Sequence, residues 1–330
     1  MKIEDTSAYP RPQFRRKSWL CLDGEWQFAY DDELRARIPA EVREWPMRIR
    51  VPFAPESRAS GIHDTGFHRA CWYQREFDVP LPSLNGFGHP VQRTLLHFGA
   101  VDYHARVWVN ETLVADHEGG HTPFIADISR ALGPGPQKLT VRAYDDPFDL
   151  EKPRGKQDWR LEPHSIWYPR TTGIWQTVWL EQVPDTYIET LWWAPNLERW
   201  EIGLHGLIRG RAEGTHMTVT LRIGETVLAE DSYRVMHNEV HRRIGLSDPG
   251  IDDYRNELLW SPERPTLIEA DITLERDGDV LEEIESYTAL LLFYHHDSRA
   301  DRRHGSSEPL PGLSEGRFQA THVVSPWSSH

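Results

Sequence analysis

The sequence has few cysteines and no long apolar run. Its 330 residues contain only Cys21 and Cys71, so a disulfide framework is not expected, and reduced thiols in the cytoplasm are the simplest interpretation. No segment approaches the roughly 18 apolar residues of a transmembrane helix. The N-terminal segment MKIEDTSAYPRPQFRRKSW lacks the apolar core, about 7–15 residues long, of a signal peptide. The sequence therefore predicts a cytoplasmic protein.

Positive charge is also scarce, with 37 Lys and Arg against 51 Asp and Glu and a net charge of −14. Such a chain lacks the basic face that nucleic-acid phosphates or an anionic membrane require, so neither is an expected partner. Neutral sugars remain compatible with this charge.

Several chemistry-bearing motifs are missing too. The sequence has no glycine-rich phosphate loop, no nucleophile elbow and no CxxC pair, so we expect no cofactor. His237 and His241 have the i, i+4 spacing of a helical zinc site. The alternating pattern around them indicates an extended segment, where this spacing does not converge, and no metal site is predicted.

Helical periodicity is weak, and residues 31–44 are the best short helical candidate. Alternation of apolar and polar residues dominates instead, and Asp277-Gly278 after the last alternating run is a strong hairpin signal. The alternating runs lie at 101–109, 139–143, 217–223 and 268–274. With 24 Pro and 23 Gly, this pattern predicts an all-β protein built of sandwiches.

Two domains and a tail are expected. A boundary near Pro184-Asp185 ends a first sandwich at residues 1–183. Residues 184–290 have the strand spacing of a seven-stranded sandwich of ~100 residues. Residues 291–330 show no periodicity and are rich in Ser, Pro, Arg and His, which predicts a disordered tail or the remnant of another domain.

Several motifs resemble glycoside hydrolase family 2, the β-galactosidase and β-glucuronidase family. In chain order they are WLCLDGEWQFAYD at 19–31, IRVPFAPES at 49–57, CWYQREFDVP at 71–80, residues 93–129, KLTVRAYDDP at 138–147, residues 153–191 and LLWSPERPTLIEADITL at 258–274. The resemblance implies a jelly-roll sugar-binding domain at 1–183 and an immunoglobulin-like sandwich at 184–290. In that family the chain then enters a catalytic (β/α)₈ barrel of roughly 250–300 residues, for which 291–330 is too short.

The resemblance also bears on catalysis. Retaining glycosidases need two carboxyl groups about 5–5.5 Å apart, and in this family both are barrel glutamates. Asn-Glu pairs at 110–111, 238–239 and 256–257 match the acid/base dipeptide but fall in the sandwiches, so no catalytic residue is assigned. We therefore expect this chain to be the inactive N-terminal portion of a family 2 glycosidase. We also expect the chain to self-associate through the surface that a barrel would cover. The alternatives are a stand-alone carbohydrate-binding protein or a structural, oligomerising module.

Six residues are candidates for sugar binding. Relatives carry an aspartate at the end of the strand that here precedes Asp145 and Asp146, and it reaches the sugar. An exposed carboxylate outside the core could accept hydrogen bonds from hydroxyls, although an Asp-Asp-Pro turn is the alternative. Three aromatic residues in a polar, loop-like context could stack on sugar C–H faces, and one arginine could donate to hydroxyls or to a uronate, unless all belong to a solvated loop. These four are Trp159, Trp167, Tyr168 and Arg154.

Overall fold

The computed structural model describes residues 9–83, 91–246 and 257–291. Residues 292–330, nearly all of the predicted tail, and Asn256 of the third Asn-Glu pair lie outside these ranges. The chain forms two compact units. Residues 16–185 make up most of the first, and the second begins at Thr186 and also includes Arg11–Arg15.

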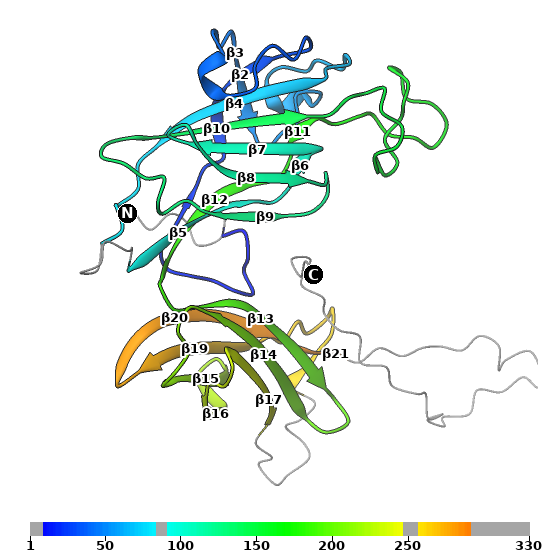
Figure 1. Cartoon of the computed structure of the whole chain (residues 1–330). Helices are drawn as coiled ribbons and strands as arrows, with labels where there is room; N and C mark the ends of the chain where they lie inside the picture. The colour runs from blue at the N-terminus through cyan, green and yellow to red at the C-terminus, as the bar shows by residue number, and fades with distance from the viewer. Residues whose placement is uncertain (1–8, 84–90, 247–256, 292–330) are drawn as a thin grey trace, which may run out of the picture. The chain divides into compact units, whose positions relative to one another are not determined.

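The described part of the first unit is a sandwich of a six-stranded sheet, order β3-β2-β4-β10-β7-β8, and a four-stranded sheet, order β1-β12-β5-β9, with a small β11-β6 pair (Figure 1). Every pairing between its strands is antiparallel. The strands are β1 (Trp19–Cys21), β2 (Gly24–Tyr30), β3 (Met47–Val51), β4 (Ala70–Phe77), β5 (Gln92–Phe98), β6 (Val101–Asp102), β7 (His104–Val109), β8 (Thr112–Glu118), β9 (Phe124–Asp127), β10 (Gln137–Tyr144), β11 (Gly173–Ile174) and β12 (Val178–Pro184).

Alternation along β10 builds the core of this sandwich. Leu139, Val141 and Ala143 are fully buried, as their spacing predicts. They join Trp26 and Phe28 of β2, together with residues of β5 and β12, in one hydrophobic cluster between the sheets. Burying each large apolar side chain contributes about 1.5–3 kcal/mol, which makes this sandwich a rigid support for its loops.

The second unit is a seven-stranded sandwich of the immunoglobulin-like class. Its described sheets have the orders β13-β14-β17 and β16-β15-β19-β20, with a short β18-β21 pair beside them (Figure 1). The strands are β13 (Tyr187–Asn196), β14 (Glu201–Arg209), β15 (Thr215–Ile223), β16 (Thr226–Arg234), β17 (Glu239–Gly245), β18 (Leu259–Trp260), β19 (Ile268–Arg276), β20 (Asp279–Thr288) and β21 (Leu290–Leu291). Alternating residues such as Val219 and Ile272 face its core. The all-β prediction is confirmed.

Tight turns lie at two of the Asn-Glu pairs that match the acid/base dipeptide. Asn110 and Glu111, with φ of 48° and 68°, connect β7 to β8, and Asp277 with Gly278 connects β19 to β20 in the same left-handed manner. His237 and Asn238 form another such turn, with φ of 52° and 63°. His241 therefore lies on a strand rather than one helical turn away from His237.

The helix expected over residues 31–44 does not form. The segment contains only a 3₁₀ turn at Pro39–Glu41. The Asp31 carboxylate accepts the backbone N–H groups of Arg35 at 2.8 Å and Ala36 at 3.0 Å, which folds the chain into a loop. In the described residues no helix has the length and apolar character needed to cross a membrane. Cys21 and Cys71 are not joined by a disulfide.

Candidate functional site

The predicted sugar-binding residues fall in the long connection between β10 and β11, residues 145–172, which we call the β10–β11 loop. It projects beyond the ends of these strands (Figure 1). Loops of this length within a compact domain are uncommon and are usually functional. Its two halves are tied together, because the Asp158 N–H donates to the Tyr168 carbonyl and the Tyr168 N–H to the Lys156 carbonyl, both at 2.9 Å.

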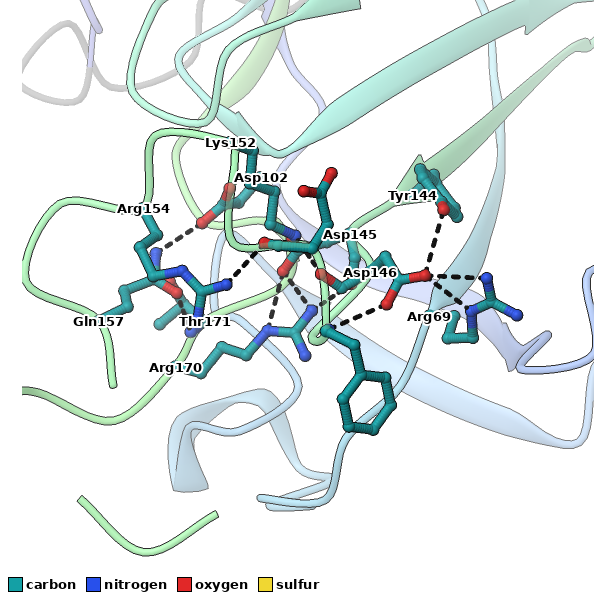
Figure 2. Close-up of polar contacts among 12 residues, drawn as sticks. Arg69, Asp102, Tyr144, Asp145, Asp146, Lys152, Arg154, Gln157, Arg170 and Thr171 are labelled. Carbon is teal, nitrogen blue, oxygen red and sulfur yellow. Dashed lines mark hydrogen bonds and ion pairs between the residues drawn. The ribbon is translucent and has the colours of Figure 1, made fainter. Parts of the chain in front are cut away.

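Asp145 is buried, with 3% of its surface exposed, so the prediction that it lies outside the core is wrong. One carboxylate oxygen pairs with the Lys152 ammonium. The other accepts the Arg170 Nε–H at 2.9 Å and a second hydrogen bond from Nη2 of the same guanidinium (Figure 2). Lys152 and Arg170 come from the two ends of the loop, so Asp145 closes it onto the sandwich. Both carboxylate oxygens are occupied by these cations.

Two further polar residues complete what we call the Asp145 cluster, which comprises Asp102, Asp145, Lys152, Gln157 and Arg170. Gln157 Nε2 donates to Asp102 Oδ2 at 2.7 Å, and Asp102 is itself buried at the end of β6. Gly120 packs so closely on Asp102 that a Cβ there would overlap its carboxylate. All five residues line one small cavity, together with Pro147, Pro153, Arg154 and Asp158.

Burial shifts the titration of this cluster. Removal from water and repulsion by the Arg170 guanidinium lower the pKa of Lys152 to about 7. Burial likewise raises the pKa of Asp102 and lowers that of Arg170. Interactions with the partner groups offset the cost of removing each charge from water. Removal of one cation therefore leaves a buried, uncompensated charge.

Asp146 is half-buried and has different partners. Its Oδ2 accepts hydrogen bonds from Arg69 Nη2 at 2.8 Å and Nε at 3.1 Å, and its Oδ1 accepts the Phe148 N–H at 2.9 Å (Figure 2). Burial would raise its pKa, but these hydrogen bonds outweigh burial and hold the pKa below its ordinary value. The Phe148 contact is the Asp turn that the alternative interpretation of Asp-Asp-Pro expected.

Glu56 follows β3 and contacts the C-terminal end of the loop at Thr172. Its pKa is also shifted by burial. Its Oε2 accepts the Thr172 N–H at 3.2 Å, yet burial raises its pKa from 4.5 to about 7. Between these two values the folded chain holds a proton that the unfolded chain has lost. The stabilising contribution is therefore present below pH 4.5 and is lost as pH rises through about 7.

We therefore expect the melting temperature of the unsubstituted protein to fall relative to that of Glu56→Gln when the pH is raised from 5 to 8. Glutamine retains an oxygen for Thr172 and cannot ionise, which makes it the matched control. Thermal melts of both proteins across this pH range measure the effect. A difference in melting temperature that does not change with pH would contradict the assignment.

The aromatic candidates lie on the outer part of the loop. Trp159 is 44% exposed and Tyr168 is 62% exposed, whereas Trp167 is half-buried. The Trp159 ring packs edge-on against the rings of Trp167 and His164, with ring centroids 5.3 Å and 5.2 Å apart. Asp158 holds this segment, because its Oδ2 accepts hydrogen bonds from the backbone N–H and from the ring Nδ1 of His164, each at 2.7 Å. The indole and phenol faces are therefore held at the surface by a hydrogen-bonded frame.

The structure brings the six predicted residues together only in part. Asp145 and Arg154 line the same cavity, and Trp159 contacts Trp167, but Asp146 faces Arg69 instead. Arg154 donates to the Asp149 carbonyl at 2.7 Å. Of the other members of the Asp145 cluster, sequence reasoning missed Asp102, Lys152 and Arg170. The available signal was the placement of Lys152 and Arg170 near opposite ends of one loop that begins with two aspartates.

Comparison with known proteins finds a matching family model and several relatives. Residues 45–184 match the sugar-binding domain of glycosyl hydrolases family 2. The chain is 31% identical over 216 residues to the β-glucuronidase of Canis lupus familiaris, covering 58% of this chain and 32% of that protein. It is 24% identical over 250 residues to the β-galactosidase of Thermoanaerobacter pseudethanolicus, covering 74% and 31%. The chain thus spans about a third of the length of these curated relatives.

Solved structures agree on the fold. The apo β-glucuronidase of Ruminococcus gnavus superimposes with a TM-score of 0.60 at 18% identity, covering 83% of this chain and 45% of that one. The β-glucuronidase of Bifidobacterium dentium complexed with coumarin-3-O-glucuronide gives a TM-score of 0.60 at 20% identity, covering 84% and 49%. Both matches extend well beyond residues 45–184. This part of the chain, residues 45–184, belongs to the sugar-binding domain family of the family 2 glycosyl hydrolases.

Proposed function

We propose that this chain binds carbohydrate through the outer part of the β10–β11 loop and contributes no catalytic residue of its own. The observation that carries the proposal is the exposure of Trp159 and Tyr168 on a loop anchored by buried ion pairs. Flat aromatic faces pack on the C–H faces of sugars, and a held loop loses little entropy on binding. The glycoside hydrolysis named for the relatives would then need residues beyond those found here.

In this proposal Asp145 positions the loop instead of contacting the sugar. Its two oxygens already accept from Lys152 and Arg170, so a hydroxyl would have to displace a buried cation. The sugar would instead meet the aromatic faces, with the partly exposed Arg154 of the same loop as a donor to hydroxyls or to a carboxylate.

NMR titration of the ¹⁵N-labelled chain with methyl β-glucuronide and methyl β-galactoside tests the proposal. We expect weak binding, with shifts concentrated in residues 145–172, and a loss of affinity of about 2–10-fold in Trp159→Ala or Tyr168→Ala. Trp192→Ala is the matched control, since Trp192 is also 39% exposed but lies in the second unit. Equal affinities in all three variants would rule out the aromatic platform.

Self-association is the competing use of the same loop. Phe148, Leu150 and Ile166 are 73%, 70% and 68% exposed, and apolar surface of this kind favours protein contacts. Sedimentation of the same samples distinguishes the two uses. If Trp159→Ala lowers the apparent mass and leaves the sugar titrations unchanged, the loop serves association instead of carbohydrate binding.

A further inference from the structure

Two histidines face each other on neighbouring strands of the second unit. The antiparallel register pairs His205 of β14 directly with His241 of β17, and pairs His205 with Trp192 of β13 on its other side (Figure 1). Their sequence neighbours Leu204 and Val240 are buried in the core, with 0% and 2% exposed. Side chains alternate along a strand, so both imidazoles lie on the outer face of this sheet.

The rings are close enough to act as a pair. Their centroids are 3.8 Å apart, with planes inclined at 36°, and the Trp192 indole stacks on His205 at 4.8 Å and 16°. His241 is exposed and His205 half-buried, so solvent reaches the pair while the indole flanks one side. The ring torsion of histidine is broad, so the two rings can turn out of this stacked arrangement when both bind one ion.

We propose that His205 and His241 form a two-imidazole binding site for a divalent transition-metal ion of the Cu²⁺, Ni²⁺ or Zn²⁺ class. Neutral imidazole is a borderline ligand that suits these ions, whereas Ca²⁺ and Mg²⁺ require oxygen ligands. Directly opposed residues of antiparallel strands have Cβ atoms about 4.5–5.5 Å apart, a span that two imidazoles can bridge through one ion. The two strands are paired from Glu201 to Leu207, so the backbone positions of the two ligands are fixed relative to each other.

Among the described residues, the pair does not form part of a larger ligand set. In the ranges that the structure describes, no group of three or more His, Cys, Asp or Glu residues is placed to hold a metal. The site therefore supplies two protein ligands, and solvent supplies the remaining positions. Such an ion remains open to exchange or to a further donor, which sets it apart from a closed structural zinc site.

Calorimetric titration of the full chain with Cu²⁺ in a non-coordinating buffer tests the proposal. We expect one preferred site whose affinity drops by roughly 10-fold or more in His205→Gln and in His241→Gln, because each removes one of two ligands. His216→Gln is the matched control: His216 is exposed on β15 of the same unit and pairs across strands with Arg234 and Glu275, not with histidine.

Paramagnetic broadening of amide signals by Cu²⁺ locates the ion independently of affinity. Broadening centred on β14 and β17 that disappears in His241→Gln supports the site, and the exposed position of His241 makes this variant the safer of the two for folding. If the broadening centres elsewhere among the 17 histidines, or if His241→Gln binds Cu²⁺ as tightly as His216→Gln, the proposal is wrong.

Discussion

Replacing Arg170 with alanine should destabilise the first unit by about 3–5 kcal/mol, because it leaves the buried Asp145 carboxylate without its main partner. The Arg170 side chain is 9% exposed and that of Asp145 is 3% exposed, so the pair is largely removed from water. Urea unfolding, followed by hydrogen exchange of β10 amides, measures the change in the free energy of unfolding.

The neighbouring ion pair provides the matched control. Arg69 pairs with Asp146 at 2.8 Å, but its side chain is 41% exposed. Exposed pairs contribute little to stability because solvent screens them, so Arg69→Ala should have a small effect. The double variant Arg170→Ala/Asp145→Asn should recover part of the loss, since it removes the uncompensated charge. Equal losses in Arg170→Ala and Arg69→Ala would show that Asp145 does not depend on a buried pair.

Replacing Gly173 with alanine should cost about 2–5 kcal/mol of stability, from left-handed backbone strain together with overpacking. Gly173 begins β11 with φ of 76°, and a Cβ there would overlap the Tyr73 hydroxyl and lie 3.1 Å from Cys71 Sγ. Tyr73 is fully buried, and its hydroxyl also accepts the Ile174 N–H at 3.2 Å, so it cannot move aside cheaply.

Thermal melts of Gly173→Ala and Gly133→Ala check this expectation. A Cβ at Gly133 meets nothing within 4 Å, so that substitution should be close to neutral. Because Gly173 directly follows the β10–β11 loop, the alanine variant should also loosen the loop and increase its proteolysis. A melting temperature of Gly173→Ala within about 1 °C of that of Gly133→Ala would contradict the steric argument, since even 1 kcal/mol shifts the melting point by a few degrees.

Local pattern was enough to predict the architecture. Alternation at Leu139, Val141 and Ala143 predicted a strand with one buried face, because side chains on a strand have a period of two whatever the partner strand is. Asp277-Gly278 was readable as a turn for a similar reason, since left-handed backbone favours Asp and Gly. The same approach wrongly predicted a helix over residues 31–44, because the Asp31 carboxylate competes for backbone N–H groups that a helix would use.

The candidate site was predictable in location but not in chemistry. The sequence alone determined that Asp145 and Asp146 end a strand and that Trp159 and Tyr168 lie in a polar loop, because these are properties of neighbouring residues. Only the tertiary structure decided that Asp145 is buried between Lys152 and Arg170 while Asp146 turns to Arg69. The same holds for His205 and His241, which are brought together by strand register. Charge pairing and ring contact depend on distances across the fold, and a one-dimensional pattern does not contain those distances.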